Sequence, residues 1–165
     1  MTAESSTGSE RLMMLSIHPR HVAKILDGSK KVELRRTRPV VEVGQPVVIY
    51  ATVPSAAVVA SCTVAEIRTG TPAEIWSMVS ALVGVSRAEY NQYFAGSQTA
   101  VAIYLEAVEA LADQVTLTHL RSTGPFHPPQ TWHFLDRARL HQLVGRHPAA
   151  PSLSRLLNVE ALQPS

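Results

Sequence analysis

Cysteine is almost absent from this sequence of 165 residues, in which Cys62 stands alone. A lone cysteine excludes an internal disulfide and a cluster of cysteine metal ligands. The sequence also lacks an apolar run of about eighteen residues, so we expect no membrane-spanning segment. Its first ten residues have neither the basic nor the apolar part of a signal peptide. These absences predict a cytoplasmic protein with no membrane partner.

Several motifs of common enzyme classes are missing as well. The sequence has no Gly-x-Ser-x-Gly elbow, no Gly-x-x-x-x-Gly-Lys phosphate loop and no His-Glu-x-x-His pair. Seven histidines are present, but their spacing forms no ligand set. His18 and His21 could form a metal pair, yet no third ligand is clustered with them, which favours a positioning or phosphate-contact role for His18. We therefore predict no metal and no cofactor.

What is present is enough for one soluble domain with a normal core, since 45% of the residues are hydrophobic and 17% are charged. Residues 1–10 are polar and predict a disordered tail. Residues 11–146 are expected to form the domain. Residues 147–165 are expected to be a C-terminal extension, because a proline-containing linker precedes a segment that either docks as a short helix or frays.

Residues 17–38 predict a short helix, a glycine turn and a strand. Pro19 suits the first helical position, and Gly28 suits the left-handed residue that follows a helix. The expected apolar stripe of the helix is Val22, Ile25 and Leu26. Val32 and Leu34 then alternate with charged residues, so we expect them to face the core. Lys30 is expected at the mouth of a groove on the other face, beside Lys31, Glu33 and Arg35.

The same segment concentrates positive charge. Residues 20–38 carry seven basic and two acidic residues, whereas residues 39–120 carry two basic and seven acidic residues. This asymmetry indicates an anionic partner, with nucleic acid as the first choice. The charges would also suit a solvated edge strand that resists aggregation.

The remaining chain predicts further strands at 12–17, 47–51, 57–67 and 99–108, with Tyr50 favoured as a core residue. Two capping boxes, Thr71 to Glu74 and Ser86 to Glu89, predict two short helices and explain both glutamates as caps. The chain is expected to loosen after Val108, with an irregular surface segment over 122–135 and a last helix over 137–144.

The segment Gly28-Ser-Lys30-Lys-Val-Glu33-Leu-Arg35 matches the pattern Gly-x-Lys-x-x-Glu-x-Arg. In this it resembles the activating-signal-cointegrator homology (ASCH) domain of the PUA-like superfamily. Pro128 to Leu135 resembles a second family pattern, Pro-Pro-Gln-Ser-aromatic-x-aromatic-Leu, with Thr131 in place of the serine. The resemblance spans about residues 12–135. It implies an α+β fold, a small, closed, PUA-like mixed β-barrel with flanking helices.

The resembled family includes nucleic-acid binders, so our leading interpretation is the binding of nucleic acid or a modified nucleotide, RNA favoured, in a basic groove beside the motif. Gln130 can read a base edge. Trp132 either stacks a base or plugs the barrel end, and for Phe134 we favour the plug. The expected binding residues are His18, Arg20, Lys30, Lys31, Glu33, Arg35, Gln130 and Trp132.

Two other functions remain open. The family also includes a ribonuclease and an amidohydrolase that acts on acetylated cytidine, and the resemblance then implies catalysis by Lys30 with Glu33 and Arg35. Such hydrolases carry a threonine where this chain has Glu33. They also use a glutamate from the helical insert, which the sequence does not assign because both insert glutamates are expected caps. The third interpretation is a protein-interaction module that binds through an apolar patch.

Overall fold

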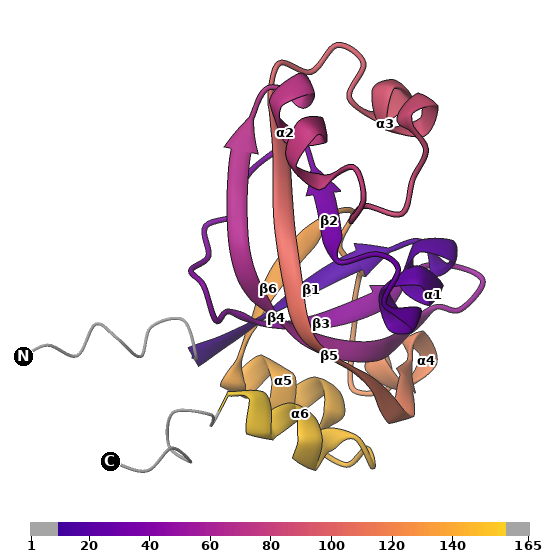
Figure 1. Cartoon of the computed structure of the whole chain (residues 1–165). Helices are drawn as coiled ribbons and strands as arrows, with labels where there is room; N and C mark the ends of the chain where they lie inside the picture. Colours follow the sequence, from indigo (N-terminus) through magenta and orange to yellow (C-terminus); the bar gives the residue numbers. More distant parts are fainter. Residues whose placement is uncertain (1–9, 158–165) are drawn as a thin grey trace, which may run out of the picture.

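The computed structural model of the chain describes residues 10–157. Within that range the chain forms one six-stranded sheet and six helices (Figure 1). The strands are β1 (Arg11–Ile17), β2 (Val32–Arg35), β3 (Pro46–Ala51), β4 (Ala57–Gly70), β5 (Ala100–Thr116) and β6 (Trp132–Asp136). The helices are α1 (Pro19–Asp27), α2 (Pro72–Val79), α3 (Arg87–Tyr93), α4 (Leu117–Leu120), α5 (Arg137–Val144) and α6 (Ala150–Leu156).

The sheet is mixed, because β1 pairs in parallel with β3 while every other pair is antiparallel. The strand order is β2-β5-β4-β3-β1-β6. The predicted α+β class is therefore confirmed. The predicted closure is wrong for the described residues, because β2 and β6 are the two ends of the order and do not pair with each other. The long strands β4 and β5 curve along the sheet, and their pairing carries three register shifts of the kind that bends strands (Figure 1).

Two segments are more regular than the sequence predicts. The strand expected to end near Val108 continues to Thr116 as β5, with the left-handed Ala107 (φ 54°) within it. Its second half is mostly exposed, so it lacks the apolar alternation that reveals a strand. The segment 122–135 was expected to be irregular, but Trp132–Asp136 forms β6 and pairs with β1. The prolines that indicated a loop lie just before this strand.

Helices α1, α2 and α3 begin at the residues that the sequence predicts, and α1 also ends where predicted. His18 is the N-cap of α1, Pro19 is its first residue, and Gly28 follows it in the left-handed region at φ 88°. Val22 and Ile25 are buried, whereas Leu26, expected on the same stripe, is 43% exposed. Both predicted capping boxes are present, on α2 and α3.

Three apolar clusters form the core. One lies around β1, β3 and β4 against α1, and a second holds Tyr50 together with residues of α5 and α6. The third lies under α2 and α3 and contains Val32 and Leu34, as predicted. Since these two residues face α2 and α3, the alternate residues of β2 face the opposite side, toward α1.

The ends of the chain are only partly described. Residues 1–9 of the predicted tail and residues 158–165 of the predicted extension lie outside the described residues. The part of the extension that is described includes α6, whose Leu153 is buried against the second cluster. Among residues 10–157, no helix is long and apolar enough to cross a membrane.

Candidate functional site

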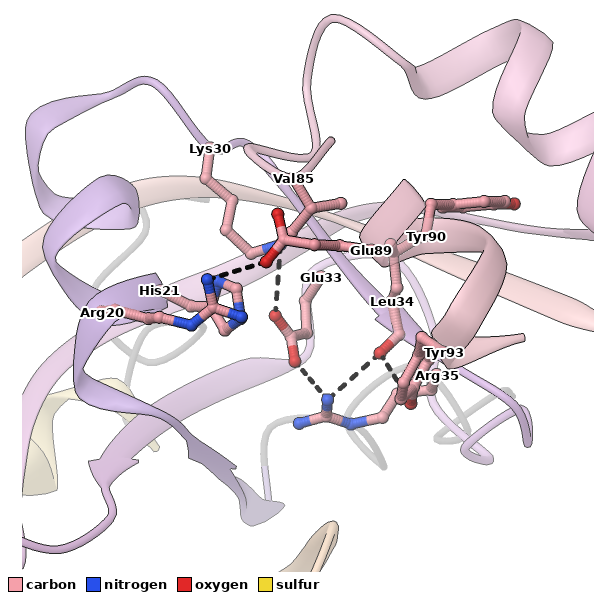
Figure 2. A pocket seen from close by; sticks show the side chains of 10 residues that line it. All are labelled: Arg20, His21, Lys30, Glu33, Leu34, Arg35, Val85, Glu89, Tyr90 and Tyr93. Carbon is pink, nitrogen blue, oxygen red and sulfur yellow. Dashed lines mark hydrogen bonds and ion pairs between the residues drawn. The ribbon is translucent and has the colours of Figure 1, made fainter. Parts of the chain in front are cut away.

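The centre of the candidate site is Glu33, which lies between two cations. Its side chain is buried on the face of β2 opposite Val32 and Leu34. The carboxylate accepts a hydrogen bond from Nη1 of Arg35, and its Oε1 lies 3.7 Å from Nζ of Lys30 (Figure 2). Strand alternation puts Glu33 and Arg35 on one face, and the turn after Gly28 brings Lys30 beside them.

Lys30 lies deeper than the sequence predicts. It was expected at the mouth of the groove, but it is 4% exposed, and its ammonium donates a 2.7 Å hydrogen bond to the carbonyl of Val83. Burial lowers the pKa of Lys30, and the charge of Arg35 lowers it further, whereas Glu33 raises it. The sequence could not indicate this burial, because the Val83 carbonyl comes from a loop 53 residues away.

Arg35 is held on several sides. Besides its bond to Glu33, the guanidinium donates to the carbonyls of Leu34 at 3.1 Å and Ser16 at 3.0 Å. Within residues 10–157 its buried Nε has no hydrogen-bond partner. Arg35 therefore has a fixed orientation, and it fixes the Glu33 carboxylate in turn.

An ion pair lies at the outer side of the site. Arg20 on α1 donates from Nη1 to Oε2 of Glu89 on α3 at 2.9 Å, and both side chains are partly exposed. Glu89 also caps α3 by accepting from the backbone N–H of Ser86. The hydrogen bond from the Ser86 N–H, and after it the bond from Arg20, lower the pKa of Glu89 to about 2. The pair thus links α1 to α3 while remaining accessible to solvent.

His21 lies beside these charges. Burial lowers its pKa, and the charges of Lys30 and Arg20 lower it further. The imidazole is therefore mainly neutral at pH 7. Its buried Nδ1 has no hydrogen-bond partner in the described part of the chain.

These side chains surround a cavity of about 180 Å³ that is open to solvent. Figure 2 shows Arg20 and His21 of α1 on one side and Tyr93 of α3 on the other, with Glu33 between them. The lining residues are Arg20, His21, Lys30, Glu33, Leu34, Arg35, Val85, Glu89, Tyr90 and Tyr93. The cavity is smaller than the ~300 Å³ at which pockets for drug-sized ligands begin, so it suits one small group such as a single base.

The structure brings together half of the residues expected at the site. Arg20, Lys30, Glu33 and Arg35 line the cavity. His18, Lys31, Gln130 and Trp132 do not. His18 is exposed and accepts from the N–H of Arg20 at 3.4 Å, while Trp132 packs against the first apolar cluster.

The segment that carries Gln130 nevertheless lies near Arg35. The Ser16 hydroxyl donates to the carbonyl of Pro129 at 2.6 Å, and the Ser16 N–H donates to the carbonyl of Thr131 at 3.0 Å. Because Ser16 also accepts from Arg35, a single residue separates this segment from the site.

Six lining residues of the cavity were not predicted as site residues: His21, Leu34, Val85, Glu89, Tyr90 and Tyr93. The sequence identified Glu89 only as a cap. In the structure it both caps α3 and lines the cavity. Glu74, the other capping glutamate, does not line the cavity. The sequence signals near His21 were the basic character of the helix before the motif and its spacing from His18.

In the described range 10–157, no three or more histidine, cysteine, aspartate and glutamate side chains lie together in a way that could hold a metal ion. Cys62 is buried, and burial raises the pKa of its thiol to about 12.

The chain is similar to known proteins in both sequence and fold. A model of the ASCH domain family matches residues 15–109. An ASCH domain-containing ribonuclease of Zymomonas mobilis is 28% identical over 132 residues, which are 79% of this chain and 88% of that protein.

Solved structures agree with the sequence match. The crystal structure of ASCH from Zymomonas mobilis has a TM-score of 0.75 and 27% identity, and the match covers 84% of this chain and 96% of that one. The N-terminal domain of Staphylothermus marinus McrB, at 9% identity and a TM-score of 0.50, shares the fold alone, with coverage of 82% and 93%. Because the family match extends over more than half of the chain, this protein belongs to the ASCH domain family.

Proposed function

We propose that this chain binds RNA and holds one nucleotide in the cavity beside Glu33. The observation that carries the proposal is the buried set of Lys30, Glu33 and Arg35 at the base of a small solvent-open cavity, with Arg20 at its edge. The similar protein from Zymomonas mobilis is named a ribonuclease, which favours RNA over DNA.

The polar groups of the cavity suit the edge of a base. Glu33 is an acceptor with a fixed orientation, and a carboxylate accepts well from an amino group such as that of cytosine. Arg20, which is largely exposed, is the cation best placed to reach a phosphate. Lys31 within the motif and Arg38 just after it add exposed positive charge. Binding of this kind weakens steeply as salt rises, because phosphate contacts release counterions.

A matched pair of arginine variants tests the proposal. Arg20 and Arg68 each form an exposed ion pair with a glutamate, and their side chains are 55% and 51% exposed. Arg68 does not line the cavity. Fluorescence anisotropy with a labelled single-stranded RNA should show weaker binding for Arg20→Met, with a salt slope smaller by about one, and unchanged binding for Arg68→Met. Equal effects of the two variants, or no RNA binding by the wild type, would overturn the proposal.

A second candidate function is hydrolysis of RNA or of an acetylated cytidine by the same site. It is favoured by the lowered pKa of Lys30, because a buried amine of lowered pKa can accept a proton. Glu89 adds a carboxylate of the helical insert to the same cavity. Arg35 and the ammonium form of Lys30 would stabilise a developing negative charge.

The two candidates predict different results for substitutions of Lys30. A hydrolase should lose turnover of RNA or acetylcytidine in both Lys30→Met and Lys30→Arg, since a guanidinium cannot give up its proton. A pure binder should show no turnover in the wild type and keep much of its affinity in Lys30→Arg. Melting curves of both variants must accompany the assay, because Lys30 is buried and its loss also affects the fold.

A further inference from the structure

Exposed Arg36 stacks on the half-buried ring of Tyr93 next to the cavity. The guanidinium carbon of Arg36 lies 4.1 Å from the centre of the Tyr93 ring. Tyr93 itself lines the cavity, on the side away from Arg20 and His21 (Figure 2). Arg36 is an exposed residue, so its side chain is accessible to a ligand that reaches the rim of the cavity.

The orientation of this guanidinium is fixed before any ligand arrives. Nε and Nη2 of Arg36 both donate to the carbonyl of Tyr93, at 3.0 and 2.6 Å. The Tyr93 ring is held in turn by an edge contact with Phe94, whose ring centre is 4.7 Å away. A planar group that is already immobilised loses little side-chain entropy when a second planar group stacks on it.

The cavity is too small to hold more than one nucleotide base, so a longer RNA strand needs a further binding surface. At about 180 Å³ the cavity holds one small group, so the rest of a bound RNA strand must lie on its rim. Bases of single-stranded RNA stack readily on arginine guanidinium planes and on aromatic rings. A base in a duplex is already stacked on both faces and cannot do so.

We propose that the Arg36–Tyr93 pair is a second nucleotide subsite, which stacks the base next to the nucleotide held in the cavity. The ligand class is therefore single-stranded RNA of at least two nucleotides rather than a free nucleoside or a duplex. This inference rests on the proposed function, because it assumes that the cavity holds a nucleotide.

The test compares the affinity for a panel of nucleoside monophosphates with the affinity for the corresponding dinucleotides and tetranucleotides. The wild type should prefer the dinucleotide by about five- to 150-fold, the range expected for one stacked base. Arg36→Ala should remove most of this preference and leave mononucleotide affinity unchanged. Arg36→Lys should behave like Arg36→Ala, because an ammonium keeps the charge but offers no plane.

Arg38→Ala is the matched control. Arg38 is an exposed cation of the same segment, but it donates to the Thr69 hydroxyl at 2.8 Å and does not stack on an aromatic ring among the described residues. It should keep the preference for the dinucleotide. A duplex of the same sequence should bind the wild type more weakly than the single strand.

Each contrary result has a distinct meaning. If the wild type binds mononucleotides and dinucleotides equally, the second subsite is wrong while the cavity proposal stands. Full preference in Arg36→Lys would show that charge alone acts, which also overturns the subsite. If Arg36→Ala lowers both the mononucleotide affinity and the melting temperature, Arg36 acts only by holding the C-terminal end of α3 in place. That result would also overturn the subsite. If the wild type binds neither ligand, the proposed function itself fails.

Discussion

At the scale of single residues, Glu33 holds the charges of the site in balance. Lys30 and Arg35 are both largely buried, and both lie against the Glu33 carboxylate. Removing that charge leaves two cations without a counter-charge in a poorly solvated position. Glu33→Gln should therefore lower the free energy of unfolding by about 3–5 kcal/mol.

Lys30→Met should be less damaging, because Glu33 keeps its partner Arg35. The variant loses the hydrogen bond to the Val83 carbonyl and should lower the free energy of unfolding by about 1–3 kcal/mol. Urea denaturation of both variants measures which of the two loses more free energy of unfolding. A larger loss for Lys30→Met than for Glu33→Gln would contradict this account of the charges.

His21 should make stability depend on pH. Its pKa in the folded protein lies below the ordinary value, so between the two values the unfolded chain binds the proton more readily. Stability is then retained above about pH 6.5 and falls as the pH drops through that value toward the folded-state pKa. Burial shifts the pKa of His133 in the same direction.

Thermal melts from about pH 8 to about pH 5 measure this dependence. The His21→Gln variant should show a shallower loss of melting temperature toward acid than the wild type. Combining it with His133→Gln should flatten the curve further. If the double variant loses as much melting temperature toward acid pH as the wild type, other groups cause the pH dependence of stability.

At the scale of elements, the capping boxes allow Glu89 to be tested apart from the stability of α3. Glu89 and Glu74 are the third residues of equivalent boxes, and glutamine serves a capping box as well as glutamate does. Only Glu89 pairs with Arg20 at the cavity. Glu89→Gln should therefore free Arg20 for a phosphate and raise RNA affinity up to about fivefold.

The matched variant Glu74→Gln should leave RNA affinity unchanged, because Glu74 lies outside the cavity. The two variants should also melt within a few degrees of each other. Weaker RNA binding in Glu89→Gln would mean that the carboxylate contacts the ligand instead of competing with it for Arg20.

The elements that depend on local chemistry were predicted well. The proline and glycine at the ends of α1 and the two capping boxes are signals within a few residues, and each element is present. The alternation in β2 correctly placed Val32 and Leu34 in the core. The signal in these cases is carried by neighbouring residues, so one sequence is enough to read it.

The features that were missed depend on distant contacts. β6 follows two prolines and has no alternating pattern, so only its pairing with β1 reveals it. Lys30 is buried by a loop 53 residues away, and Arg20 pairs with a glutamate 69 residues away. Gln130 and Trp132 were placed at the site from a motif, but neither lines the cavity.

At the scale of the whole molecule, α6 is expected to contribute to global stability. Leu153 is 2% exposed and belongs to the same apolar cluster as Leu12 of β1 and Leu143 of α5. Leu153→Ala should lower the free energy of unfolding by about 2–5 kcal/mol, as removal of a buried leucine side chain does. Leu26→Ala, at a position 43% exposed, should cost much less.

Chemical denaturation followed by both circular dichroism and tryptophan fluorescence measures this effect. The two probes should give one coincident transition in the wild type. A separate early transition for the C-terminal part, with no effect of Leu153→Ala on the main one, would show that α6 is only loosely attached. Such a result would favour the predicted domain boundary at residue 146.

The central claim is that RNA occupies the cavity between α1, β2 and α3. A titration of the ¹⁵N-labelled protein with a short single-stranded RNA, followed by amide chemical shifts, tests it most directly. We predict that the largest shifts map to residues 20–21, 30–36 and 85–93, which line or flank the cavity. Shifts confined to the acidic second half of β5 or to the surface around His133 and Arg139, or an absence of shifts, would contradict the claim.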